Sequence, residues 1–113
     1  MEITIAERGG STVVEVAGSV DGMTADELLS TLGEQVKAGR VNLVADLSEV
    51  EYTSSAGLRA LLATVKAARQ HGGDFRIAGV RPDVMRVLEM SGFTSILQVY
   101  GGVEEALESF GDA

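Results

Sequence analysis

Segments with the pattern of β-strands alternate with segments with the pattern of α-helices along the whole chain, and this alternation constrains the fold more than any other feature. The central strand candidate, Val41 to Leu47, is a short apolar run typical of a strand buried on both faces of a parallel sheet. Apolar residues at helical spacing precede and follow it. The alternation predicts an α/β domain whose parallel strands are joined by right-handed helical crossovers.

The first two predicted strands, at 3–7 and 12–18, form a hairpin through a turn at Arg8 to Ser11, so the first strand must be antiparallel to its neighbour. Further strands are predicted at 41–47, 75–80 and 96–100. The sequence therefore predicts a mostly parallel five-stranded sheet with an antiparallel N-terminal edge strand and four main helices.

Capping residues and glycines mark the ends of the predicted helices. Thr24 with Glu27 forms a predicted capping box, and Pro82 suits the first position of the third helix. Gly39, Gly72-Gly73 and Gly92 are predicted stops. The apolar residues expected to face the core are Leu28, Leu29, Leu32, Val36, Leu58, Leu61, Leu62, Val65, Val84, Val87, Leu88, Val103, Ala106, Leu107 and Phe110.

Composition narrows the classes of function. The 113 residues correspond to one domain, 1–113. Nine Lys and Arg against 17 Asp and Glu give a net charge of −8, which disfavours nucleic acid or an anionic membrane as the partner and favours a basic protein surface. The chain has no Cys, no apolar run long enough to span a membrane, and no signal-peptide pattern at its start. We therefore expect a soluble, cytoplasmic domain.

The predicted loops at the carboxyl ends of the parallel strands, 19–23, 48–54 and 80–81, form the candidate site, because ligands and partners gather at that end of an open sheet. The first two follow consecutive strands and are expected to be neighbours. Their hydroxyl and acidic side chains either cap helices or bind a partner, and the residues alone leave both interpretations open. These side chains are Ser19, Asp21, Thr24, Glu49, Glu51, Thr53, Ser54 and Ser55.

Catalytic motifs are absent from the sequence. It contains no phosphate-binding loop, no dinucleotide fingerprint and no nucleophile elbow. The single histidine, His71, lies 16 positions after Ser55, so the two would be ~24 Å apart on one helix and cannot act as nucleophile and base. The acidic residues lack the spacing of a calcium loop. We expect no enzyme activity, no cofactor and no metal.

The segment from Tyr52 to Leu62, Tyr-Thr-Ser-Ser-Ala-Gly-Leu-Arg-Ala-Leu-Leu, joins a strand-exit loop to a helix that has Gly57 in its first turn. A glycine there predicts close approach by another molecule. The segment resembles the signature of the STAS domain family, the bacterial anti-sigma factor antagonists. Gly18-Ser19-Val20-Asp21 and Leu88-Glu89-Met90-Ser91-Gly92-Phe93 are similar to two further elements of that family, so the resemblance covers essentially the whole chain. It implies a right-handed β/α superhelix.

The resemblance also implies a binding switch. Members of the family bind an anti-sigma factor that is also a serine kinase, and they thereby free the sigma factor. The kinase inactivates them by phosphorylating a serine at the start of the second helix, and a PP2C-type phosphatase restores them. In this sequence the acceptor position is Ser55, with Ser54 where the family often has Asp and Ala56 where it has Ser or Thr.

The surface expected to bind the partner comprises Asp21, Thr24, Ser54, Gly57, Leu58 and Arg59. The substitution at Ser54 leaves an alternative open, which is a STAS adaptor that is not phosphorylated and serves in a transport or sensory complex.

Overall fold

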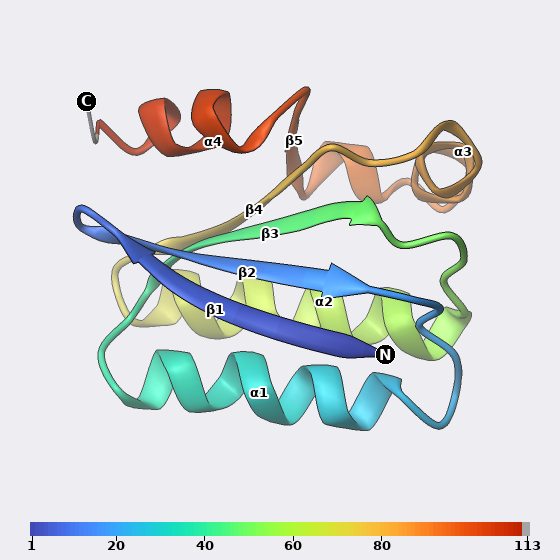
Figure 1. The fold of residues 1–113 in the computed structure, drawn as a ribbon, viewed down its shortest axis with the longest axis horizontal. Helices are drawn as coiled ribbons and strands as arrows, with labels where there is room; N and C mark the ends of the chain where they lie inside the picture. Colours follow the sequence, from blue (N-terminus) through green and yellow to red (C-terminus); the bar gives the residue numbers. More distant parts are fainter. Residues whose placement is uncertain (112–113) are drawn as a thin grey trace.

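The computed structural model describes residues 1–111 and contains one five-stranded sheet with the strand order β1-β2-β3-β4-β5 (Figure 1). Strand β1 is antiparallel to β2, and all the other neighbouring strands are parallel. The strands are β1 (Glu2–Arg8), β2 (Ser11–Ala17), β3 (Asn42–Glu49), β4 (Asp74–Ala78) and β5 (Gln98–Tyr100). The predicted α/β fold class, a mostly parallel sheet with an antiparallel N-terminal edge, is confirmed.

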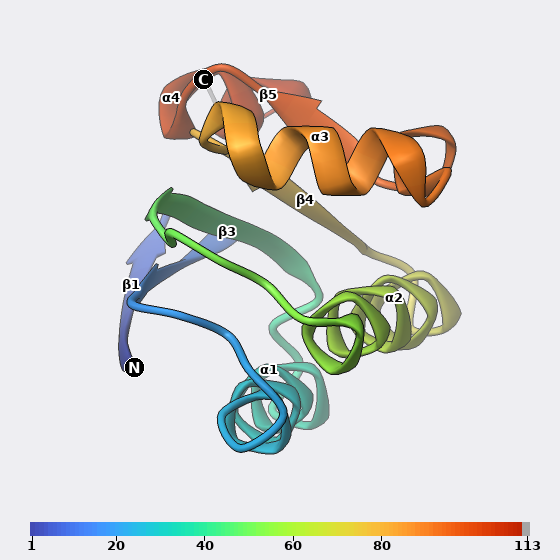
Figure 2. The same cartoon turned by 90° about the vertical axis from the view of Figure 1, so that its right-hand side faces the viewer.

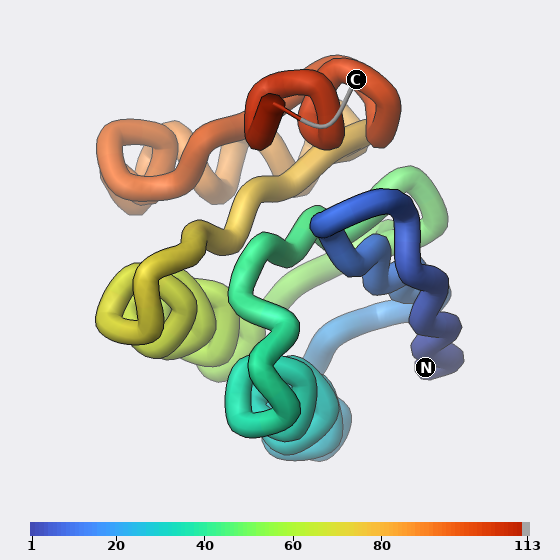
Figure 3. Tube along the Cα trace, turned by 90° about the vertical axis from the view of Figure 1, so that its left-hand side faces the viewer, coloured from blue at the N-terminus to red at the C-terminus, as the bar shows by residue number. Residues whose placement is uncertain are grey.

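Helices cover both faces of the sheet, but unequally. Helices α1, α2 and α3 form an arc on one face, where they enclose the main core with the inward side chains of β2, β3 and β4 (Figure 2). Helix α4 lies on the opposite face and packs on Val13, Val44 and Ala78 (Figure 3). The helices are α1 (Ala25–Lys37), α2 (Ser55–Gln70), α3 (Pro82–Met90) and α4 (Val103–Ser109), with a short 3-10 helix, η1 (Phe93–Ser95), before β5.

The N-terminal hairpin is tighter than predicted. The strands continue until Arg8 pairs with Ser11, so the turn consists of Gly9 and Gly10 alone. Gly9 has a φ of 64°, a left-handed conformation that glycine adopts without a steric penalty, and a positive φ at the first turn position matches the right-handed twist of a hairpin.

The predicted buried faces of the helices are confirmed for most residues but not for two of them. Leu28, Leu32 and Leu88 are fully buried, whereas Leu29 and Val87 are 39% and 37% exposed. Both exposed residues lie at the flank of an apolar stripe, where the helix surface curves away from the sheet. Helical spacing locates such a stripe, but it does not show how wide the contact with the sheet is.

A buried ionic network ties α4 to the sheet. Arg76 on β4 donates to Asp74 Oδ2 at 3.0 Å and to Ser109 Oγ at 2.7 Å, and its guanidinium carbon lies 4.0 Å from the centre of the Phe110 ring. Arg69 at the end of α2 donates to Asp74 Oδ1 at 2.8 Å. Asp74 therefore connects Arg69 of α2 with Arg76 of β4, and Arg76 in turn contacts Ser109 of α4.

Within residues 1–111, none of the helices is both long and apolar enough to cross a lipid bilayer. The same residues contain no group of three or more His, Cys, Asp or Glu side chains arranged to hold a metal ion.

Candidate functional site

The loops that follow β2 and β3 lie side by side at the carboxyl end of the sheet, the end that faces the viewer in Figure 2. Val20 pairs with Thr53 in an isolated parallel bridge, in which the Val20 amide donates to the Tyr52 carbonyl at 2.9 Å and the Ser54 amide donates to the Val20 carbonyl at 2.8 Å. The expectation that these loops are neighbours is confirmed. The bridge places Asp21 and Ser54, each one residue further along, at the same edge.

The third loop joins the same end of the sheet. Arg81, just before α3, donates from Nε to the Ser48 carbonyl oxygen at 2.8 Å, and its guanidinium lies 3.7 Å from the Glu49 carboxylate. Ser48 and Glu49, which were expected in the loop, are the last residues of β3.

Ser54 and Ser55 have different environments at the start of α2. Ser54 is the N-cap, and its hydroxyl oxygen accepts a hydrogen bond from the Gly57 amide at 3.2 Å. Asp and Ser are both favoured N-caps, so Ser54 performs the structural task that an Asp would perform there. Ser55, the first residue of the helix, is exposed, and within residues 1–111 its hydroxyl has no hydrogen-bond partner.

The start of α2 favours a negative charge at Ser55. The first turn of α2 contains no acidic residue, and the backbone amides at the start of a helix carry a partial positive charge. Arg59, one turn further along, is exposed. An anion attached to Ser55 would meet a favourable helix dipole without a carboxylate in the same turn.

Asp21 holds the start of α1, and the predicted capping box at Thr24 and Glu27 is wrong. One carboxylate oxygen of Asp21 accepts from the amides of Met23 and Thr24, each at 2.9 Å, while the Thr24 hydroxyl oxygen accepts from the Asp21 amide at 2.9 Å. The reciprocal pair therefore lies three residues earlier than predicted. Thr24 has helical backbone angles and makes no side-chain cap, so Glu27 has no cap to complete.

Hydrogen bonds from the Thr24 amide, then the Met23 amide and the Thr24 hydroxyl hold the pKa of Asp21 below its ordinary value. A lowered pKa in the folded state means that Asp21 stabilises the fold above its ordinary pKa of about 3.9, and that this contribution is lost as the pH falls through the lower folded value. We expect Asp21→Ala to lower the melting temperature at pH 7, whereas Asp21→Asn keeps an accepting oxygen and most of the stability. Thermal unfolding from pH 7 to pH 2 tests this, and an Asp21→Ala protein with wild-type stability at pH 7 would contradict it.

Gly57 and Leu58, both expected on the contact surface, are buried instead. A Cβ atom on residue 57 would collide with the Oγ1 of Thr53 and lie 2.8 Å from Cγ1 of Val20 and 3.3 Å from its carbonyl oxygen. The close approach that the glycine permits is therefore internal, between α2 and the bridge that joins the two loops. Leu58 is 7% exposed and belongs to the main core.

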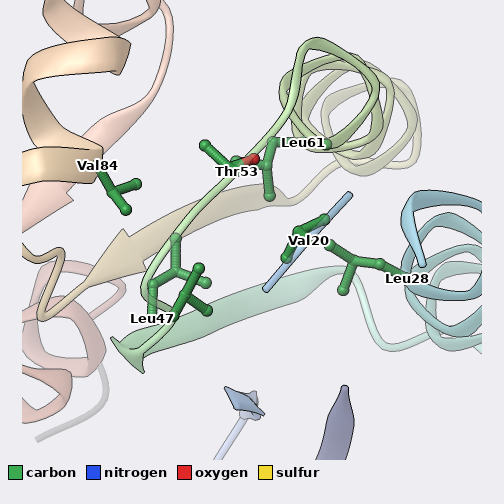
Figure 4. Close-up of a pocket in the computed structure, with 8 residues that line it drawn as sticks. Val20, Leu28, Leu47, Thr53, Leu61 and Val84 are labelled. Carbon is green, nitrogen blue, oxygen red and sulfur yellow. The ribbon is translucent and has the colours of Figure 1, made fainter. Parts of the chain in front are cut away.

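Below Gly57 is a small apolar cavity, of about 10 Å³, where side chains from three helices and the two loops converge (Figure 4). Its size corresponds to at most one water molecule, so it is a packing gap and not a ligand site. The lining residues are Val20, Leu28, Leu47, Val50, Thr53, Gly57, Leu61 and Val84.

We expect Gly57→Ala to destabilise the protein by about 1–3 kcal/mol, because the added methyl group must displace buried side chains of both loops. Chemical denaturation measures this change. Gly33→Ala is the matched control, because residue 33 lies within α1 with nothing within 4 Å of an added Cβ, and alanine favours the helix by about 1 kcal/mol. A Gly57→Ala protein of unchanged stability that had lost partner binding would instead favour an external role for the glycine.

Two exposed apolar side chains at this end of the molecule were not predicted. Met23, in the loop before α1, is 90% exposed, and Tyr52, in the loop before α2, is 55% exposed. Tyr52 directly precedes Thr53 of the bridge, and Met23 donates its amide to the Asp21 carboxylate. Their loop positions have no periodicity, so no hydrophobic pattern could have identified them.

His71 lies at the far end of α2, where it is the C-cap. Its Nδ1 lies 2.8 Å from the Ala67 carbonyl oxygen. The structure therefore places it at the opposite end of the helix from Ser55, where its ring interacts with a free carbonyl of the last turn.

Comparison with known proteins gives consistent results. The model of the STAS domain family matches residues 2–106. BtrV of Bordetella bronchiseptica is 36% identical over 110 residues, which cover 97% of this chain and 95% of BtrV. The crystal structure of an anti-sigma factor antagonist from Mycobacterium paratuberculosis is 30% identical, with a TM-score of 0.89 over 98% of this chain and 94% of that one.

The Bacillus cell fate determinant SpoIIAA, solved in its phosphorylated form, has the same fold. Its TM-score is 0.74 at 14% identity, and the match covers 96% of this chain and 98% of SpoIIAA.

Proposed function

The chain belongs to the STAS domain family, and we propose that it is an anti-sigma factor antagonist whose partner binding is controlled by phosphorylation of Ser55. In this proposal it binds an anti-sigma factor that is also a serine kinase, and binding releases the sigma factor. The name of the 30% identical structural relative supports the role, because that match covers nearly the whole of both chains.

The observation that carries the proposal is the division of tasks between two adjacent serines. Ser54 caps α2, so its hydroxyl oxygen is engaged with the Gly57 amide, whereas Ser55 is exposed and has no partner within the described residues. A kinase needs a hydroxyl that it can reach without breaking a helix cap. Ser55 meets this requirement, and a PP2C-type phosphatase would have the same access to the phosphorylated residue.

The partner-binding surface that we propose surrounds Ser55 and combines polar and charged side chains with two exposed apolar ones. Its members are Asp21, Thr24, Ser54 and Arg59 from the sequence prediction, together with the exposed Met23 and Tyr52. Gly57 and Leu58 support this surface from below. The two exposed apolar side chains, Met23 and Tyr52, are the expected anchors of the contact, whereas charges at the rim, such as Arg59, mainly alter the rate of association.

The acceptor is tested by incubating the protein with anti-sigma factor kinases encoded in the same genome and ATP, followed by mass spectrometry. We expect one phosphate per chain, abolished in Ser55→Ala and retained in Ser54→Thr, which keeps a capping hydroxyl. Full incorporation in Ser55→Ala that disappears in Ser54→Ala would transfer the acceptor role to Ser54.

The alternative function, a STAS adaptor that is not phosphorylated, predicts a different result in the same experiment. A protein that binds none of these kinases and takes up no phosphate, but copurifies with subunits of a transporter or sensor, would support the adaptor. This alternative rests on Ser54, which stands where the family often has Asp. Ser54 still caps α2, so the replacement changes the charge beside Ser55 and leaves the helix start in place.

A further inference from the structure

Strand β1 forms an open edge of the sheet. It has seven residues in an unbroken antiparallel register with β2, from Glu2 opposite Ala17 to Arg8 opposite Ser11. All of its residues except Ile3 are exposed. The opposite edge, β5, has only three residues. Natural edge strands are usually protected by charged side chains, by proline, by a bulge or by a covering segment. Strand β1 has no Pro and no bulge, and its charged residues, Glu2, Glu7 and Arg8, are of both signs.

The two-residue turn determines which backbone groups of β1 point outward. In a hairpin of this kind the residues that flank the turn form a hydrogen-bonded pair, and such pairs alternate along the ladder. Because Arg8 pairs with Ser11, the even-numbered residues bond to β2. The amides and carbonyls of Ile3, Ile5 and Glu7 therefore face away from the sheet and can accept a further strand.

The sequence of β1, Glu-Ile-Thr-Ile-Ala-Glu-Arg, is complementary to itself when two copies run antiparallel about Ile5. In that register each Glu2 lies opposite Arg8 of the other copy, and the two Ile5 side chains face each other across the symmetry axis. Ile5 is 38% exposed and pairs with the fully buried Val14 within its own sheet. Opposite charges and β-branched pairs directly across neighbouring strands both stabilise a sheet.

We propose that β1 pairs with β1 of a second copy of this chain, antiparallel and centred on Ile5, and joins the two sheets into one. The pairing uses the outward backbone groups of Ile3, Ile5 and Glu7 and two Glu2–Arg8 pairs. Arg8 already contacts Glu104 at 2.9 Å within its own chain, but the two side chains are 48% and 71% exposed, so this contact is weak and can be given up. The dimer leaves Ser55 accessible, because β2 separates β1 from β3 and α2.

Charge reversal tests the register. Glu2→Arg places two arginines opposite each other in a dimer of that variant, and Arg8→Glu places two glutamates opposite each other. We expect each variant alone to dimerise roughly tenfold more weakly than the wild type in sedimentation equilibrium. An equimolar mixture should recover wild-type affinity as a heterodimer, because every cross-strand pair is then of opposite charge. Glu89→Arg on α3 is the matched control, because it makes the same change of charge at an exposed residue outside β1, and it should leave dimerisation unchanged.

Amide exchange measured by NMR at low and high protein concentration provides an independent readout. We expect the amides of Ile3, Ile5 and Glu7 to become protected as the concentration rises, while those of Thr4 and Ala6 are protected at every concentration. A wild-type protein that is monomeric at millimolar concentration overturns the proposal. So does a mixture of the two charge-reversed variants that forms no heterodimer, or protection that appears on a different element.

Discussion

Protein phosphorylated on Ser55 is expected to bind its anti-sigma factor about a thousandfold more weakly than the unmodified protein, while its fold remains the same. A phosphate adds about −1.5 to −2 charge at neutral pH. At the start of α2 the helix dipole favours that charge by about 0.3–1 kcal/mol, and the first turn has no carboxylate to oppose it. These amounts are small beside a domain stability of roughly 5–15 kcal/mol.

The partner surface is more sensitive to the phosphate than the fold is. Docking against Ser55 would remove water from the phosphate, and an unpaired charge in a buried interface costs several kcal/mol, which corresponds to a thousandfold loss of affinity. We therefore expect a local block. Ser55→Asp should reproduce it only in part, because a carboxylate has less charge and bulk, and Ser55→Ala should bind like the unmodified protein.

The measurement compares partner affinity and amide exchange for the phosphorylated and unmodified proteins. Titration calorimetry gives the affinity, and exchange followed along the chain reports the fold. Protection in β1 and α4 should be the same in both forms. These elements do not contact the start of α2, because β1 is the edge strand beyond β2 and α4 packs on the opposite face of the sheet, so a loss of their protection would show that phosphorylation acts by unfolding part of the domain, even if the affinity fell as expected.

The order and type of the elements could be predicted from the sequence because each apolar segment has one clear periodicity and a turn signal at each end. Val41 to Leu47 shows the principle, since a segment buried on both faces is apolar at nearly every position. Details that depend on a three-dimensional neighbour could not be predicted. The length of the turn at Gly9 and Gly10 depends on how far the pairing of β1 with β2 continues. Leu29 lies at the flank of the buried stripe of α1 and is 39% exposed, and helical spacing alone does not show where that stripe ends.

The loops that form the candidate site could be predicted, but the roles of individual residues within them could not. Strand order alone brings the loops after β2 and β3 together, and the bridge between Val20 and Thr53 confirms this. The role of Gly57 could not be deduced, because a glycine that accepts a partner and a glycine that accepts a neighbouring side chain have the same sequence signal. The same is true of Asp21, whose carboxylate turns back to the amides of its own loop.

Removal of the Asp74 carboxylate is expected to destabilise the protein by about 3 kcal/mol, because it leaves two guanidinium groups without their shared partner. Only 11% of the Asp74 side chain and 16% of the Arg76 side chain are exposed, whereas Arg69 is 44% exposed and can recover water. The loss therefore comes mainly from Arg76. That residue would still donate to Ser109 on α4, but the ionic part of the anchor would be gone.

The pH dependence of this effect has a definite sign. Burial alone would raise the pKa of Asp74, but hydrogen bonds from Arg76, Arg69 and the Phe75 amide outweigh it, so the pKa of Asp74 is lower than its ordinary value. A lowered pKa in the folded state stabilises the fold above the unfolded pKa of about 3.9, and the contribution is lost as the pH falls through the folded value. The difference between wild type and Asp74→Asn should therefore be largest near neutral pH and shrink below about pH 4.

Urea denaturation of wild type, Asp74→Asn and Glu104→Gln at pH 7 and pH 3 separates the buried network from an ordinary surface pair. The control variant removes the exposed Arg8–Glu104 pair, whose contribution is expected to be about 0–1 kcal/mol. Since Asp74 holds Arg76, which contacts Ser109 of α4, the Asp74→Asn protein should also lose amide protection in α4 before the rest of the sheet unfolds. If Asp74→Asn were no less stable than Glu104→Gln at pH 7, the network would not anchor α4. Other packing contacts would then be what holds α4 on the sheet.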